Sequence, residues 1–98
     1  MIIDFYPDTY EKIKSLSLKE SARIIKVIEL FEEFGFGLTA KHLKKITTGL
    51  WELRSGRWRI LFGIINNKTY IVNLFLKKTQ EIPLKEINKA IRRLKAIL

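Results

Sequence analysis

The sequence predicts an α+β fold in which helices cover one face of a small antiparallel sheet. Apolar residues alternate with a period of two between residues 50 and 77, and they recur at helical spacing before and after that region. The length of 98 residues suits one domain over residues 1–98, because a chain of this size builds a single core. The expected order of elements is one strand, two N-terminal helices, three strands and a C-terminal helix.

The N-terminal part is expected to form the first strand and both N-terminal helices. Residues 2–6 are apolar and β-prone, and Pro7 breaks that pattern and favours the start of a helix that ends near Ser15. Ser17 and Glu20 have the spacing of a capping box, in which each side chain accepts a hydrogen bond from a free backbone N–H. The apolar residues that follow cover a wide helix face, which predicts packing against the sheet. They are Ala22, Ile24, Ile25, Val27, Ile28, Phe31 and Phe34.

The middle of the chain changes from helical to strand-like patterning. Gly35 and Gly37 favour the end of the second helix. Residues 38–48 are rich in lysine and are expected to form a short helical turn or a basic loop. Turn-forming residues then separate three alternating runs, which predicts a three-stranded antiparallel meander. Its strands are expected at residues 50–54, 57–65 and 69–77.

The last segment is expected to be a basic amphipathic helix. Pro83 suits a first helical position, and apolar residues then recur at helical spacing opposite basic ones. The apolar residues are Ile87, Ala90, Ile91, Leu94 and Ile97, and the basic ones are Lys85, Lys89, Arg92, Arg93 and Lys95.

Positive charge is concentrated in the second part of the chain. Residues 1–40 contain five basic and seven acidic residues, whereas residues 41–98 contain fourteen basic and three acidic ones, a net charge of +11. Such a charge attracts polyanions and speeds encounter with them. The partner is therefore expected to be a nucleic acid, an acidic protein or an anionic membrane; the alternative is that the basic residues only solvate the protein.

Several classes of function are excluded by composition. The absence of cysteine excludes disulfides, thiolate zinc sites and a cysteine nucleophile, and it fits a cytoplasmic location. No apolar run approaches the length of about 20 residues that a membrane span needs, and the N-terminus does not resemble a signal peptide. A single histidine, His42, and the lack of nucleotide-binding glycine motifs predict no metal and no small-molecule cofactor.

Alternation along the meander predicts two faces of the sheet. The face expected to form the core carries Trp51, Leu53, Trp58, Ile60, Phe62, Ile64, Tyr70, Val72, Leu74 and Leu76. The other face carries Glu52, Arg54, Arg57, Arg59, Leu61, Ile71, Asn73, Phe75 and Lys77. Arginines on neighbouring strands can hold a phosphate, and an exposed Phe75 can stack on a base, so this face is a candidate site for single-stranded RNA. The alternative is a solvated face on which Glu52 pairs with an arginine.

Three segments share a specific pattern: an aromatic-Glu-Leu-Arg strand, an arginine-bearing second strand and a Phe-x-Lys-Lys-Thr strand end. They are Gly49-Leu-Trp-Glu-Leu-Arg54, Trp58-Arg-Ile-Leu-Phe62 and Phe75-Leu-Lys-Lys-Thr-Gln80, with Pro83 beyond them. On these segments the sequence resembles the RelE/ParE toxin superfamily, and in particular its HigB-like, phage-related branch. The resemblance implies a RelE-like fold and the toxin of a type II toxin–antitoxin system. It further implies a cytoplasmic endoribonuclease, or mRNA interferase, that cuts mRNA in the decoding site of the ribosome and inhibits translation.

The resemblance also implies a metal-independent reaction, in which a ribose 2′-oxygen attacks the adjacent phosphate. Arg54 and Arg59 are then expected to stabilise the phosphorane, and Lys77 or Lys78 to supply charge or protonate the leaving oxygen. Glu52 is expected to act either as the base or as an orienting partner for an arginine. The residues expected to bind RNA are Arg57, Phe75, Lys44 and Lys45.

Two other classes of function stay open. The ParE branch of the superfamily poisons DNA gyrase through protein contacts, and a non-catalytic cationic module would only hold phosphate. Many active relatives carry a histidine, tyrosine or aspartate near the C-terminus for proton transfer, and this sequence has none there. Either lysine and arginine suffice, or His42 contributes from the preceding segment, or the protein cleaves weakly. Every one of these alternatives implies a cognate antitoxin, an acidic amphipathic partner that neutralises the positive surface.

Overall fold

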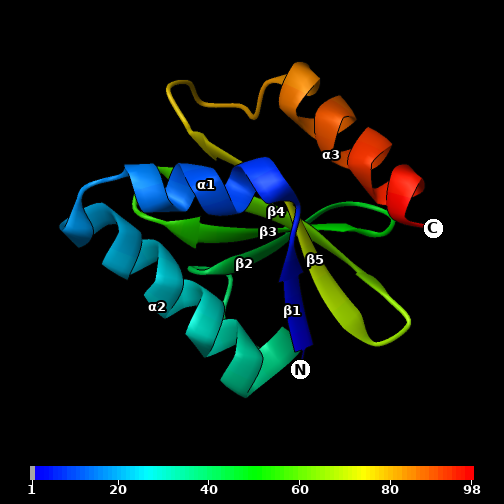
Figure 1. The fold of residues 1–98 in the computed structure, drawn as a ribbon, viewed down its shortest axis with the longest axis horizontal. Coiled ribbons are helices and arrows are strands. Elements are labelled where there is room, and N and C mark those ends of the chain that lie inside the picture. Colours follow the sequence, from blue (N-terminus) through cyan, green and yellow to red (C-terminus); the bar gives the residue numbers. More distant parts are fainter. Residues whose placement is uncertain (1) are drawn as a thin grey trace.

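The computed structural model describes residues 2–98, which form three layers (Figure 1). A five-stranded sheet lies in the middle, with two helices on one face and one helix on the other. The helices are α1 (Pro7–Ser15), α2 (Leu18–Phe34) and α3 (Leu84–Ile97). The strands lie in the order β1 (Ile2–Phe5), β5 (Lys68–Leu76), β4 (Trp58–Ile65), β3 (Leu50–Ser55) and β2 (Leu43–Thr47). The α+β class is confirmed, and only the pairing of β1 with β5 is parallel.

The predicted start and end of the second helix are confirmed, but the capping box is only half formed. The Ser17 hydroxyl accepts a hydrogen bond from the backbone N–H of Glu20 at 3.2 Å, and Gly35, with a φ of 54°, ends α2. The Glu20 carboxylate accepts a hydrogen bond from the Ser17 hydroxyl at 3.4 Å, but none from the Ser17 backbone N–H. It accepts a hydrogen bond at 2.8 Å from the indole Nε1 of Trp58, which attaches α2 to β4.

The expectation of a helical turn or loop in residues 38–48 is wrong, because this segment contains β2. Lys44 of β2 pairs with Glu52 of β3, and Leu43 is buried against α2. A register shift between Lys45 and Thr47 breaks the alternation, which hides the strand pattern in the sequence. β2 is an edge strand, and lysines are common on edges because they discourage pairing with other chains.

The expectation that all helices cover one face is also wrong, since α3 packs on the opposite face from α1 and α2 (Figure 1). Phe62 pairs with Ile71 and Leu61 pairs with Asn73, so Val72 is an extra residue in β5. This bulge reverses the alternation, and Ile71 joins the α2-side core while Val72 joins the α3-side core. The α3-side core consists of Leu50, Leu61, Val72, Phe75 and Ala90, with Tyr70 packed against it.

Polar contacts as well as apolar ones hold α3 on the sheet. The guanidinium of Arg93 donates two hydrogen bonds to the Asp8 carboxylate of α1, at 2.8 and 2.5 Å, and a third to the carbonyl oxygen of Val72 at 2.8 Å. The same guanidinium lies 4.2 Å from the centroid of the Tyr6 ring. The Asn73 amide donates to the carbonyl oxygen of Glu86 at 3.0 Å. Arg93 thus joins the C-terminal helix to α1 beside β5, and Asn73 joins the same helix to β5.

Gly63 allows α3 to approach the sheet closely. A Cβ at this position would lie 2.8 Å from Leu94 Cδ1 and 2.9 Å from the carbonyl oxygen of Gly49. We expect Gly63→Ala to lower the free energy of unfolding by about 1–3 kcal/mol, because an overpacked core must shift backbone as well as side chains. Chemical denaturation measures this effect. Gly37→Ala is the matched control, since a Cβ there meets nothing within 4 Å; equal stability of the two variants would contradict the prediction.

Among the helices formed by residues 2–98, none combines the length and the apolar character that crossing a membrane requires.

Candidate active site

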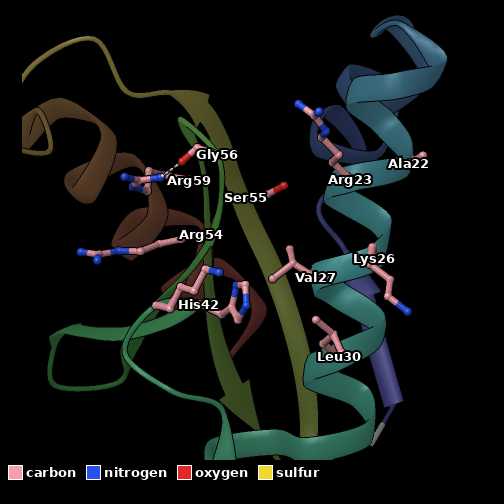
Figure 2. A pocket seen from close by; sticks show the side chains of 11 residues that line it. Ala22, Arg23, Lys26, Val27, Leu30, His42, Arg54, Ser55, Gly56 and Arg59 are labelled. Atoms are coloured by element: carbon pink, nitrogen blue, oxygen red, sulfur yellow. Dashed lines mark hydrogen bonds between the residues drawn. The ribbon is translucent and has the colours of Figure 1, made fainter.

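The centre of the site is an ionic cluster on β3 and β4. Glu52 and Arg54 are two residues apart on β3, and Arg59 of β4 is paired with Arg54. Since side chains alternate along a strand, all three lie on the α3-side face of the sheet. Figure 2 shows the side chains of Arg54 and Arg59 pointing away from α2. The sheet therefore brings together three of the residues that were predicted to act in catalysis.

Glu52 lies beneath the two arginines, and its side chain is 1% exposed. Arg54 Nε donates a hydrogen bond to Glu52 Oε1 at 2.6 Å, and Arg59 Nε is 3.9 Å from Glu52 Oε2. A buried carboxylate is tolerated when cations pair with it. Of the two roles expected for Glu52, the geometry favours the orienting partner, because both of its oxygens face guanidinium groups rather than solvent.

Arg59 is the more enclosed of the two arginines. Its Nη1 donates hydrogen bonds to the carbonyl oxygens of Gly56 at 2.8 Å and Trp58 at 3.0 Å, and its side chain is 13% exposed. Burial lowers the pKa of Arg59, the Glu52 carboxylate opposes this by raising it, and Arg54 lowers it further. An arginine keeps its charge in proteins even so. Arg59 therefore presents a positive charge that is held by the backbone and only weakly hydrated.

A cavity of about 380 Å³ opens beside Arg59. It is lined by Arg57, Arg59, Lys77, Lys78, Thr79 and Gln80. The backbone N–H of Lys77 donates to the carbonyl oxygen of Arg57 at 2.8 Å, which attaches the end of β5 to the β3–β4 turn. Four cations and no acidic residue line this cavity, an arrangement that suits a phosphate group. Below, it is called the phosphate cavity.

The two lysines of β2 that were expected to bind RNA lie on opposite faces. Lys44 is exposed and pairs with Glu52 in register, so it flanks the ionic cluster. Lys45 is on the α2 side, where its Nζ lies 5.7 Å from the centroid of the Trp51 ring. The structure therefore groups Lys44, but not Lys45, with the arginines.

The expected stacking role of Phe75 is wrong. Phe75 pairs with Arg59 across β4 and β5, as the alternation predicted, but only 4% of it is exposed. It packs in the α3-side core against Ala90 and Val72. The ring supports the strand that carries Arg59 and has no surface on which a base could stack.

Sequence reasoning missed a second cavity, of about 600 Å³, between α2 and the β3–β4 hairpin (Figure 2). It is lined by Ala22, Arg23, Lys26, Val27, Leu30, Lys41, His42, Arg54, Ser55, Gly56 and Arg59. Below, it is called the helix cavity. Arg23 and Lys26 are distant from the strands in sequence, so strand alternation gives no signal for them. Their spacing of three residues, which places both on one side of a helix, is the pattern that could have grouped them.

In the part of the chain that the structure describes, no three histidine, cysteine, aspartate or glutamate side chains gather in a group that could hold a metal ion.

The sheet, its three helices and the order of its elements define the RelE-like fold. A crystal structure of the isolated E. coli RelE toxin superposes with a TM-score of 0.58 at 14% sequence identity, covering 95% of this chain and 97% of that chain. The family model described as phage derived protein Gp49-like (DUF891) matches residues 11–95. The chain therefore belongs to the Gp49-like family of phage-derived proteins, and the predicted resemblance to the HigB-like, phage-related branch is confirmed. A search of curated proteins gives no significant match.

Proposed function

We propose that this chain is the toxin of a type II toxin–antitoxin system and cuts mRNA in the decoding site of the ribosome. The observation that supports this most directly is the phosphate cavity, where Arg57, Arg59, Lys77 and Lys78 surround a space without any carboxylate. Membership of a HigB-like toxin family supports the same proposal. Single-stranded mRNA supplies both the phosphate and the 2′-hydroxyl that the reaction needs.

In the proposed reaction the ribose 2′-oxygen attacks the adjacent phosphorus, and the bond from phosphorus to the 5′-oxygen of the next nucleotide breaks. The products are a 2′,3′-cyclic phosphate and a 5′-hydroxyl end; the proton of the 2′-hydroxyl passes to solvent, and the leaving 5′-oxygen takes up a proton in return. Negative charge grows on the phosphorane oxygens, and fixed cations stabilise it more in the transition state than in the substrate. Arg59 and Arg54 have this role, because Glu52 and the Gly56 carbonyl hold their guanidinium groups in place.

Proton transfer falls to the two lysines in this proposal. Lys77 and Lys78 line the phosphate cavity and are the titratable groups there that can carry a proton to the leaving 5′-oxygen. Glu52 is a positioning residue, because its oxygens lie under the arginines. His42 lines the helix cavity, and the proposal assigns no proton transfer to it.

The proposal includes two partners in the cytoplasm. The ribosome with its mRNA is the target, and a cognate antitoxin is the inhibitor. Residues 41–98 carry a net charge of +11, and an acidic antitoxin segment would neutralise it while covering the arginines.

A non-catalytic module that only holds phosphate is the second candidate. One observation favours it: neither an imidazole nor a carboxylate lines the phosphate cavity, so the proton-transfer groups of many nucleases are missing there. The same experiment separates the two candidates.

Induced expression in a bacterial host, with mapping of mRNA ends on ribosomes, tests the proposal. We expect cuts with 5′-hydroxyl ends in register with codons. The double variant Lys77→Ala/Lys78→Ala should cut at least about 100-fold more slowly, because it loses the proton-transfer groups. The double variant Lys85→Ala/Lys89→Ala removes the same charge from α3, outside the phosphate cavity, and should cut like the wild type.

Two outcomes would contradict the proposal that the chain is a nuclease. Growth arrest without such cuts would indicate another target, such as DNA gyrase. No arrest at all, with retained RNA binding, would indicate the non-catalytic module.

A further inference from the structure

The helix cavity adjoins the phosphate cavity, and Arg59 lines both. Part of its α2 wall is apolar: Figure 2 shows Val27 and Leu30 pointing from α2 toward the hairpin. Its volume of about 600 Å³ lies within the range of about 300–1,000 Å³ that small ligands occupy in proteins. The chain thus has a second space next to the proposed reaction centre, with a different chemical lining.

The charged residues that line the helix cavity are all cations. Arg23 and Lys26 of α2 and Lys41 of the following segment line it, and no aspartate or glutamate is among the lining residues. Arg54 and Arg59 line it as well, but their guanidinium groups point away from α2 (Figure 2), so Arg23 directs its charge most plainly toward the cavity. Figure 2 shows the Arg23 guanidinium extending toward the hairpin. An occupant of this cavity is therefore expected to be anionic, with part of its surface apolar.

Two polar side chains of the helix cavity are not used by the fold. Within residues 2–98, the Ser55 hydroxyl and the His42 imidazole form no hydrogen bond to another group. Figure 2 shows the Ser55 hydroxyl pointing toward α2. A hydroxyl donates and accepts hydrogen bonds, and so does a neutral imidazole, so both can bind the edge of a nucleobase.

We propose that the helix cavity binds the nucleotide next to the scissile phosphate of single-stranded RNA. The unstacked base lies against Val27 and Leu30, its edge meets Ser55 and His42, and Arg23 binds the flanking phosphate. The inference rests on the proposed function and extends it, because it names the part of the substrate that is recognised. An acidic peptide would satisfy the cations, but RNA also accounts for the apolar wall and for the connection to the phosphate cavity through Arg59.

Equilibrium binding of RNA to the purified chain tests this inference without ribosomes or cleavage. The probe is a fluorescein-labelled 2′-O-methyl RNA octamer, which lacks the attacking hydroxyl. It is used as four homopolymers and as a version with abasic positions. We expect the homopolymers to differ in affinity and the abasic octamer to bind at least about fivefold more weakly, because stacking and apolar contact with a base are worth that much.

Two pairs of variants locate the binding. Arg23→Ala should weaken binding and reduce the slope of log Kd against log salt concentration by about one, as expected for one lost phosphate contact. Lys19→Ala removes the same charge from the exposed side of α2, outside the helix cavity, and should leave the slope unchanged. Ser55→Leu should fill the helix cavity and remove the preference among bases, whereas Thr47→Leu on β2 should keep it.

The inference and the proposed function can fail separately. The octamer could bind with an affinity that Arg59→Ala lowers and that Arg23→Ala and Ser55→Leu leave unchanged. The helix cavity then does not bind RNA, and the proposed nuclease activity is not contradicted. If Arg23→Ala and Ser55→Leu both abolish base-dependent binding but no mRNA cuts appear in cells, the helix cavity binds RNA and the proposed nuclease activity is wrong. Equal binding of abasic and intact octamers, with displacement by a polyglutamate peptide, would overturn the inference in favour of an acidic protein partner.

Discussion

Arg59→Ala is expected to reduce mRNA cleavage by about 10²–10³-fold, the loss that follows removal of one fixed donor to a developing anion. The effect is large because Arg59 lines the phosphate cavity and is 13% exposed. Solvent screens its charge little, and water cannot take its place in the same orientation. Single-turnover cleavage of mRNA on purified ribosomes measures the loss, and Arg92→Ala on the exposed side of α3 is the charge-matched control.

Arg59→Lys separates charge from geometry at the same position. A lysine keeps the positive charge but has all its donors on one nitrogen, so it loses the fork in which Nη1 binds the carbonyls of Gly56 and Trp58 and the other nitrogens remain for a phosphate. We expect cleavage between that of wild type and Arg59→Ala. Full activity in Arg59→Ala, in a variant shown to be folded by circular dichroism, would remove this residue from the mechanism.

Glu52→Ala is expected to have the largest effect on stability among single substitutions in the site, lowering the free energy of unfolding by about 3 kcal/mol. The carboxylate is buried between Arg54 and Arg59, and its loss leaves two neighbouring cations on adjacent strands without a counter-charge. Urea denaturation measures the change. Glu52→Gln keeps the volume and one hydrogen-bond acceptor for Arg54, so it should cost about 1–2 kcal/mol.

The same pair of variants tests the role of Glu52 in the reaction. As a positioning residue, Glu52 acts through the arginines, so Glu52→Gln should retain partial cleavage with an unchanged dependence on pH. Complete loss of cleavage in a stable Glu52→Gln protein, together with a changed pH profile, would make Glu52 the base and contradict its assignment as a positioning residue.

Much of the fold could be predicted because its signals are local. The cap at Ser17, the end of α2 at Gly35 and the alternation of β3 and β4 depend on neighbouring residues. The cluster of Glu52, Arg54 and Arg59 follows from the same alternation, since a short turn fixes which residues face each other. The proximity of these three side chains was therefore predictable from the pattern of two strands.

The errors arise where the pattern is interrupted or where contacts are distant in sequence. The bulge at Val72 reverses the faces of β5, so Ile71 moved to the α2-side core. The burial of Phe75 depends on α3, whose side of the sheet no local pattern determines. The helix cavity is lined by residues of α2, β3 and β4, and strand alternation does not predict where a helix packs on the sheet.

The contacts that join the two ends of the chain have a consequence for synthesis of the protein. β1 pairs with β5, and Asp8 of α1 binds Arg93 of α3, so neither contact can form until the ribosome has made the last third of the chain. Contacts between distant parts of a sequence form late because a long loop must close first. On the nascent chain, the arginines of β3 and β4 therefore emerge before the helix that covers their side of the sheet. Because β5 and α3 are the last elements to emerge, we expect the site to be completed only after the chain has left the ribosome that makes it.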